Sequence, residues 1–232
     1  MGFDGLFIHS LLIELNQTLV NGHISKITQP FASGFVFTIR SNRKNYNLFL
    51  NSSNQNAYFG ITNKNFQNPL TAPNLLMTFR RYLLNGKLIN ILQNENDRIV
   101  NFQISNTNEF GDAVIYNLFF EILGSKTNII LVNSEKKIID LLKKIPLYEN
   151  RPMLPGLEYQ IPQNDKLNPF NAELSQPVSA YQGFNKVSQS AVNNNLKTFI
   201  NNFNYPKPTY SIKKNDFFAW NYFKENDAEI KK

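Results

Sequence analysis

Two adjacent residues of opposite charge carry the most specific chemistry in this sequence. Asp97 and Arg98 follow Asn94, Glu95 and Asn96, a run typical of a turn. A guanidinium forms two-pronged contacts with a phosphate or a base edge that a lysine does not reproduce. Asp97 can hold the turn through backbone amides or accept a hydrogen bond from a nucleobase amino group. The simpler alternative is a capped turn beside a solvated arginine.

We expect Asp97 and Arg98 to open a strand over residues 97–105. Successive side chains of a strand point to opposite faces, so the two charges are not expected to form a simple ion pair. Each is predicted to have a partner of its own.

A second polar group lies between two strongly apolar runs. A hairpin turn with positive φ angles explains Gly124 and Asn128. It explains Glu121 less well, since this carboxylate closes an apolar run. The group consists of Glu121, Gly124, Ser125, Lys126, Thr127 and Asn128.

Basic side chains form clusters on a chain whose formal net charge is +7. On a helix, Arg80 and Arg81 lie about 100° apart, so both can flank the apolar stripe and face one polyanion. Each cluster alone is typical of a solvated surface, but together they predict a surface that faces RNA. The clusters are Arg40, Arg43 and Lys44; Arg80 and Arg81; and Lys136, Lys137, Lys143 and Lys144.

The composition argues against several other classes of protein. The chain has no cysteine, and its histidines, His9 and His23, lack a carboxylate cluster between them, so we expect no disulfide, metal or cofactor. The first residues lack a signal-peptide pattern, and no apolar run approaches about 20 residues. We therefore expect a soluble cytoplasmic protein without membrane association.

The elements that position these residues are predicted from apolar periodicity and turn signals. Asp4 caps a helix that is expected to end at Asn21 and Gly22, and Pro73 begins a second helix over 74–85. Alternating runs predict antiparallel strands. The strands are expected over 23–29, 34–40, 45–50, 57–61, 87–93, 97–105, 114–123, 128–133 and 137–142.

These elements predict an α+β fold, a two-sheet β-rich sandwich with flanking helices over residues 1–147. A linker is expected over 148–171, where four prolines favour extended chain. Short helices are expected within 172–232. The aromatic cluster near the end indicates either a docking surface or a chain cut from something longer. It consists of Phe217, Phe218, Trp220, Tyr222 and Phe223.

Several segments, in order and spacing, resemble the N-terminal domain of the NFACT family. They are FDGLFIHSLLIELNQTL at the start, ITQPF at 27–31, FTIRSNRKNYNLFL at 37–50, NDRI at 96–99, NEFGDA at 108–113 and EILGSKTNIILV at 121–132. This resemblance covers nearly all of residues 1–170. Known members include the bacterial factor for alanine tailing in ribosome quality control, also called a fibronectin-binding protein.

The resemblance implies binding to the large ribosomal subunit with a stalled peptidyl-tRNA, and recruitment of alanyl-tRNA. Asp97 and Arg98 match the family's Asp-Arg motif for tRNA engagement. Glu121 opens a match to its Glu-Ile-Met-Gly turn, with Leu123 in place of Met. Ser125 and Lys126 stand where the family has a basic residue followed by His. The resemblance also implies a fold like formamidopyrimidine-DNA glycosylases, followed by a helix-hairpin-helix element. Full-length members continue into a coiled coil and a further RNA-binding domain, so the chain resembles only the front part.

We expect no enzymatic activity. The glycosylases start from an N-terminal proline followed by glutamate, and this chain has Gly2 and Phe3. The hairpin motif departs from its pattern as well, because Asn185 replaces the second glycine after Gly183 and Phe184, which argues against phosphate binding there. The alternatives are a surface adhesin for fibronectin, which only the family name suggests, and a degenerate glycosylase-like DNA-binding module.

Overall fold

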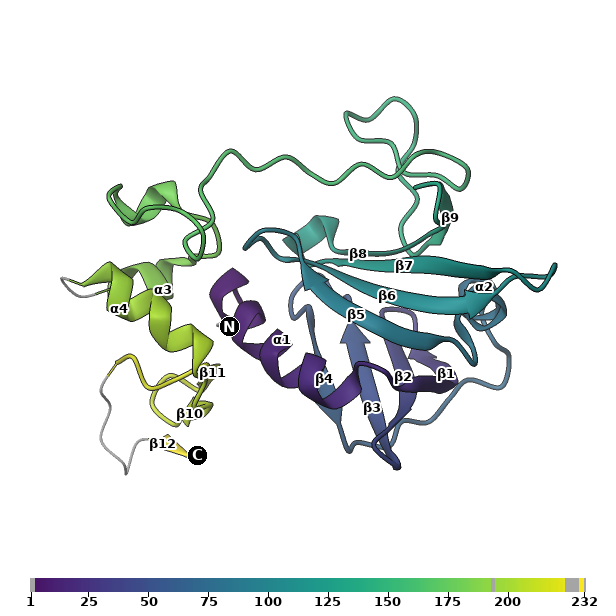
Figure 1. Cartoon of the computed structure of the whole chain (residues 1–232), viewed down its shortest axis with the longest axis horizontal. Helices are drawn as coiled ribbons and strands as arrows, with labels where there is room; N and C mark the ends of the chain where they lie inside the picture. Colours follow the sequence, from purple (N-terminus) through teal and green to yellow (C-terminus); the bar gives the residue numbers. More distant parts are fainter. Residues whose placement is uncertain (1–2, 193–194, 224–229, 232) are drawn as a thin grey trace. The chain divides into compact units, whose positions relative to one another are not determined.

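The computed structural model describes residues 3–192, 195–223 and 230–231 (Figure 1). Gly2, on which the comparison with the glycosylases depends, lies outside the described residues. The helices and strands are α1 (Gly5–Leu19), β1 (His23–Phe31), β2 (Gly34–Ser41), β3 (Lys44–Asn51), β4 (Tyr58–Thr62), α2 (Asn74–Leu83), β5 (Lys87–Gln93), β6 (Ile99–Thr107), β7 (Ala113–Glu121), β8 (Asn128–Val132), β9 (Ile138–Leu141), α3 (Lys186–Ala191), α4 (Leu196–Asn201), β10 (Thr209–Ser211), β11 (Asp216–Phe218) and β12 (Ile230–Lys231). Short 3-10 helices cover Gly124–Lys126, Val178–Ala180 and Asn202–Asn204.

The chain divides into two compact units. Unit 1 comprises the described residues of 1–14, 93–98 and 162–232, and unit 2 comprises residues 15–92 and 99–161. Helix α1 therefore contributes residues to both units. So does the β5–β6 hairpin, because its tip at 93–98 belongs to unit 1.

Unit 2 is built on one sheet with the strand order β4-β3-β2-β1-β5-β6-β7-β8-β9. The prediction of an α+β fold with mainly antiparallel strands is confirmed. The prediction of two separate sheets is wrong, because β1 pairs with β5 through His23 and Lys87 and joins the two halves. Figure 1 shows these halves as two layers whose strands cross. Phe59 of β4 contacts Phe102 of β6 at a ring distance of 5.9 Å, so the halves still pack as a sandwich.

The ends of the first elements follow from local residue types. The carboxylate of Asp4 accepts the N–H of Phe7 at 3.0 Å and caps α1, as predicted. Asn21 ends that helix with a φ of 69°. Helix α2 ends at Leu83 rather than at Asn85, because Asn85 has a φ of 65°, which a continuing helix cannot accommodate.

The first part of the predicted proline-rich linker is packed chain. Ile145 and Met153 exchange backbone hydrogen bonds of 2.9 Å in both directions. Met153 and Tyr159 are buried in a cluster with Phe119 of β7 and with β8 and β9. Apolar burial therefore holds residues 145–161 in unit 2, and the boundary between the units falls between 161 and 162, inside the predicted linker.

Two of the aromatic residues near the end of the chain belong to the core of unit 1, whereas Phe217 is exposed. Phe218 and Tyr222 are buried against Leu6, Phe199 and Phe203. The expectation of an exposed docking surface is therefore wrong for these two residues, because the first turn of α1 and the short helices provide their packing partners. In this unit, β10 lies between β11 and β12.

The helical part of unit 1 is small. Helices α3 and α4 have six residues each, and Asn185 caps α3 through hydrogen bonds from Val187 and Ser188 of 2.8 Å each. The helix-hairpin-helix and glycosylase-like assignments stay predictions. Among the residues that the structure describes, no helix combines the length and apolarity needed to cross a membrane.

Candidate functional site: a pocket at Asp97 and Arg98

The tip of the β5–β6 hairpin is fixed by buried amide groups. Asn96 is fully buried, and its backbone N–H donates to Gln182 Oε1 at 3.1 Å. The side-chain amide of Gln93 donates to the carbonyl oxygens of Gly5 and Asp97, both at 2.9 Å. Three distant stretches of unit 1 therefore meet at this tip.

Two glycines allow the close approach. A Cβ on Gly5 would lie 2.0 Å from the carbonyl oxygen of Asn96, and one on Gly183 would lie 2.0 Å from Asn96 Nδ2. Gly183 also has a φ of +83°, which disfavours other residues. Glycine at both positions is required for the tip to dock within unit 1.

Asp97 and Arg98 lie in the bend before β6, so the prediction that they open a strand is wrong. The backbone N–H of Asp97 donates to Asn94 O at 2.9 Å, which closes the turn and delays the start of β6 to Ile99. Asp97 Oδ1 accepts the N–H of Arg98 at 2.7 Å. The carboxylate thus holds the turn, the first of the two roles considered for it.

A chain of hydrogen bonds connects Asp97 to Lys166. Asp97 Oδ2 accepts from Asn164 Nδ2 at 2.8 Å, and Asn164 Oδ1 accepts the backbone N–H of Lys166 at 3.2 Å. The carbonyl oxygen of Lys166 in turn accepts from Gln182 Nε2 at 2.7 Å. The backbone positions of Arg98 and Lys166 are therefore coupled through two polar side chains.

These residues surround a pocket of about 360 Å³ within unit 1. Arg98 and Lys166 are exposed, whereas Asp97 is half-buried. Within the described part of the chain, the guanidinium of Arg98 has no hydrogen-bond partner. Its donors are therefore available to an anionic ligand. The lining consists of Phe3, Asp4, Gly5, Asp97, Arg98, Asn164, Lys166, Gly183, Phe184 and Asn185.

A buried carboxyl group lies in the wall of the pocket. Asp4 Oδ2 accepts the hydroxyl of Ser188 at 2.7 Å, and the side chain is only 6% exposed. Burial raises the pKa of Asp4 to about 6, against the opposing effect of its hydrogen bonds from Phe7, Ser188 and Asn185 and of the charge of Arg98. Asp4 is therefore a second acidic group at this site, beyond its role as a helix cap.

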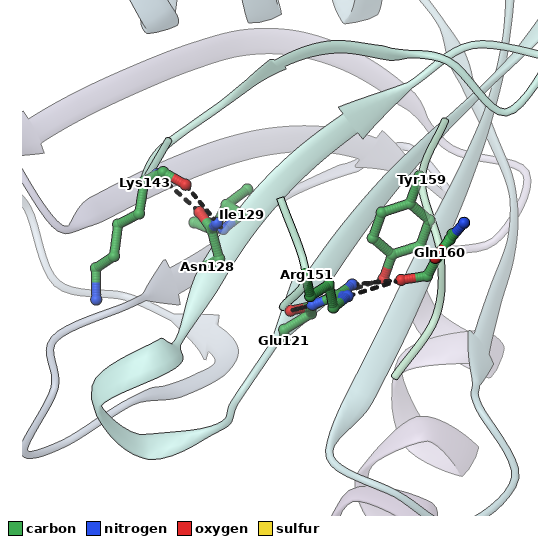
Figure 2. A network of polar contacts seen from close by, with 7 residues as sticks. All are labelled: Glu121, Asn128, Ile129, Lys143, Arg151, Tyr159 and Gln160. Atoms are coloured by element: carbon green, nitrogen blue, oxygen red, sulfur yellow. Dashed lines mark hydrogen bonds and ion pairs between the residues drawn. The ribbon is translucent and has the colours of Figure 1, made fainter. Parts of the chain in front are cut away.

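Glu121 is fully buried at the end of β7 and forms a separate network in unit 2 (Figure 2). Arg151 Nη1 donates to Glu121 Oε2 at 2.9 Å, and Nη2 donates to Oε1 at 2.5 Å. The hydroxyl of Tyr159 donates to Oε1 at 2.8 Å. Because no surface of Glu121 is exposed, the expectation of a direct RNA contact is corrected: the carboxylate holds Arg151 and Tyr159.

Ionisation of this network is set by burial and pairing. Burial lowers the pKa of Arg151, but the hydrogen bond and charge of Glu121 outweigh it, so the pKa is raised overall. Burial, followed by the charge of Glu121, raises the pKa of Tyr159. Arg151 also donates to the carbonyl oxygen of Gln160 at 2.9 Å through Nε and at 2.6 Å through Nη2. The ion pair therefore fixes residues 151–160 on β7.

Asn128 does not adopt the positive φ that the turn interpretation assumed. It opens β8, and its side chain exchanges hydrogen bonds of 2.9 Å with the backbone N–H and carbonyl of Lys143, drawn in Figure 2. Gly124 does have a positive φ, of 63°. Lys126 is exposed in the 3-10 helix that follows Leu123.

The predicted basic clusters differ in how their charges are used. Arg40, Arg43 and Lys44 are exposed at the β2–β3 hairpin. Arg80 Nε donates to Ile27 O at 3.0 Å, and Arg81 pairs with Glu109. Each guanidinium thus has a different partner in unit 2, and the expectation that Arg80 and Arg81 face one polyanion stays a prediction.

Sequence reasoning missed Asn164 and Lys166. Both lie in the segment that its prolines marked as a linker, and no local spacing relates them to Asp97, 67 residues earlier in the chain. Their polar character among prolines was the only available signal. Among the described residues, no group of three or more His, Cys, Asp or Glu side chains is placed to hold a metal ion.

Comparison with known proteins places this geometry in a family. Residues 4–215 match the family model of the NFACT N-terminal and middle domains. The chain is 41% identical over 174 residues to the Rqc2 homolog RqcH of Streptococcus pneumoniae and 37% identical over 176 residues to that of Bacillus subtilis. These alignments cover 73% and 74% of this chain but 32% and 31% of the relatives, so the chain spans about a third of their length.

Solved structures are similar over nearly the whole chain. The N-terminal part of a fibronectin/fibrinogen-binding protein from Streptococcus suis has a TM-score of 0.89 at 31% identity, and the match covers 97% of this chain and 93% of that one. The fibrinogen-binding protein from Staphylococcus aureus has a TM-score of 0.79 at 25% identity, with 97% and 94% covered. Sequence and structure agree that the chain belongs to the NFACT family.

Proposed function

We propose that this chain binds RNA in ribosome-associated quality control and that its pocket at Asp97 and Arg98 engages tRNA. The partners in this proposal are the large ribosomal subunit with its stalled peptidyl-tRNA and an incoming alanyl-tRNA, in the cytoplasm. The carrying observation is the exposed guanidinium of Arg98, whose backbone is held by Asp97 at 2.7 Å. The similarity to RqcH proteins supports the same role.

The chemistry of the pocket supports an anionic ligand. Arg98 and Lys166 are exposed on its lining, while Asp97 is occupied by the Arg98 N–H and by Asn164. Hydrogen bonds fix the backbones of Arg98 and Lys166, which reduces part of the ordering cost of contacting a phosphate. The excess positive charge of the chain adds affinity for any nucleic acid.

The test is the affinity for tRNA measured as a function of salt concentration. Arg98→Glu is expected to weaken binding strongly, and Arg98→Lys is expected to weaken it less while keeping the salt dependence. Lys197→Glu is the matched control, because it makes the same charge change at an exposed residue of unit 1 that does not line this pocket.

If Arg98→Glu and Lys197→Glu lost the same affinity for tRNA, net charge alone would explain the effect. This result would contradict a specific site. Unchanged affinity in Arg98→Glu, with unaltered circular dichroism, would reject the pocket as a tRNA site.

A second candidate function is binding to fibronectin or fibrinogen, which the names of the similar solved structures favour. Surface plasmon resonance with immobilised fibronectin tests it directly. Specific binding that survives Arg98→Glu would support this alternative over the tRNA site.

We also propose that the chain acts without catalysis. Borohydride trapping on DNA with an abasic site would reveal an amine nucleophile as a covalent adduct, and we expect none. An adduct would instead support the glycosylase-like alternative.

A further inference from the structure

An aromatic cluster covers one face of the sheet where β3 pairs with the edge strand β4. Phe49 of β3 lies on this face opposite Gly60, and it is only 3% exposed. The ring of Phe66 stacks on Phe49 at 4.9 Å, and Phe31 and Tyr58 contact Phe49 edge-on at 5.9 and 5.6 Å. The cluster lies opposite the sandwich core, because strand neighbours such as Phe59 point the other way.

Gly60 leaves a notch beside these rings. Glycine in the interior of a strand is unfavourable and often marks a place where a ligand approaches closely. An aromatic ring across the strands can compensate by covering the glycine. Here a Cβ built on Gly60 would meet nothing within 4 Å, so no ring covers it. The space above Gly60 is open.

The notch is part of a pocket of about 260 Å³. This is below the ~300–1,000 Å³ typical of sites for drug-sized ligands, so it suits a single ring system. None of its lining residues is acidic, and the exposed ammonium of Lys64 lies 5.5 Å from the ring centre of Phe66. The lining consists of Phe31, Phe49, Asn51, Tyr58, Gly60, Ile61, Thr62, Lys64 and Phe66.

We propose that the notch above Gly60 holds one unpaired nucleobase of RNA, which lies against the aromatic cluster while Lys64 attracts its phosphate. This inference rests on the proposed RNA-binding function, but it assigns a site in unit 2 that shares no residue with the pocket at Arg98.

Aromatic surfaces and a flanking cation are the elements that bind single-stranded nucleic acid with little sequence preference. Phe31 is 42% exposed, and Phe66 and Tyr58 are partly exposed, so ring surface is available to a base. Charge complementarity favours RNA over an apolar peptide, because the phosphate beside a bound base is attracted by Lys64 and an apolar side chain is not.

The experiment uses the full chain and a short single-stranded RNA with one 2-aminopurine, whose fluorescence falls when the base stacks. The wild-type chain is expected to quench the probe. Gly60→Val is expected to remove the quenching and to weaken binding by about 5- to 150-fold, the range for loss of one stacked base. Phe66→Ala should also remove the quenching, whereas Lys64→Ala should mainly reduce the salt dependence.

Gly60→Val suits this test because valine favours strands and its Cβ meets open space, so the fold should persist. Ala113→Val, at an exposed position of β7 outside the pocket, is the control for added bulk. Thermal unfolding followed by circular dichroism verifies both variants. A duplex RNA that carries the same probe should bind without additional quenching.

The proposal would be overturned if Gly60→Val quenched the probe as strongly as the wild type does. It would also be overturned if the wild type did not quench the probe. If Gly60→Val lost binding to a fibronectin fragment but kept binding to RNA, the notch would be reassigned to a protein partner. The tRNA affinity of the Arg98 variants is measured separately, so the two sites are judged independently.

Discussion

Asp97 accepts the backbone N–H of Arg98 at 2.7 Å through one carboxylate oxygen. Its other oxygen accepts from Asn164, so the acid does not pair with the guanidinium beside it. This relationship leaves the positive charge of Arg98 for a ligand. Asp97 also positions Arg98 and Asn164 through hydrogen bonds, a role that can be tested separately from its charge.

Reversing donor and acceptor in the hydrogen bond between Asn164 and Asp97 tests that role. In Asp97→Asn, the new amide oxygen still accepts the N–H of Arg98. The new NH2 group faces the NH2 group of Asn164, so two donors meet without an acceptor, because Asn164 Oδ1 already accepts from Lys166. We expect tRNA affinity to fall by about fivefold, the equivalent of ~1 kcal/mol.

The double variant Asp97→Asn, Asn164→Asp restores a donor facing an acceptor and should recover most of the affinity. A double variant as weak as the single one would show that the charge of Asp97 matters, and not the hydrogen bond.

Gly183→Ala tests the close approach at the hairpin tip. Gly183 and Gly156 have φ angles of +83° and +88°, so alanine costs about 1–2 kcal/mol of backbone strain at either site. Only at Gly183 would the Cβ also collide with Asn96, at 2.0 Å. Thermal unfolding by circular dichroism should therefore show a larger loss for Gly183→Ala than for Gly156→Ala; equal losses would mean that the tip adjusts freely.

The buried pair of Glu121 and Arg151 should behave as a structural unit. Arg151→Ala leaves the fully buried carboxylate with Tyr159 alone, so we expect a loss of about 3 kcal/mol in the free energy of unfolding, measured in urea by circular dichroism. The double variant Arg151→Ala, Glu121→Gln should be less destabilised, because it removes the unpaired charge. A double variant less stable than Arg151→Ala would contradict this account.

Asp4 should make the stability of unit 1 depend on pH. Burial raises the pKa of its carboxyl group from 3.8 to about 6, so the folded unit binds this proton more tightly than the unfolded chain does. The contribution of Asp4 to stability is therefore most favourable below pH 3.8 and is lost as the pH rises to about 6, by up to about 3 kcal/mol.

Asp4→Asn is expected to flatten this pH dependence. Trp220 is the single tryptophan of the chain and packs against the core of unit 1, so its fluorescence reports the unfolding of the unit that contains Asp4. Glu173→Gln, at an exposed carboxyl group of the same unit, is the control. Equal pH profiles for wild type and Asp4→Asn between pH 4 and 7 would contradict the effect of burial.

Local signals by themselves determined the limits of α1 and of several strands. The capping residue Asp4, the left-handed Asn21 and the turn at Asn42 and Arg43, with φ angles of 48° and 63°, lie within a few residues of the elements they delimit. Alternating apolar residues placed the strands close to their observed bounds. Such features act over short stretches of chain, so a single sequence is sufficient to recognise them.

Only the tertiary structure decided how the candidate sites are built. Asn164 reaches Asp97 from 67 residues away, and Arg151 neutralises Glu121 from 30 residues away. Local periodicity carries no information on such pairings, because they depend on how distant segments pack. The family motif marks Asp97 and Arg98 in the sequence, but burial and hydrogen bonding show that Asp97 holds the turn while Arg98 presents its charge.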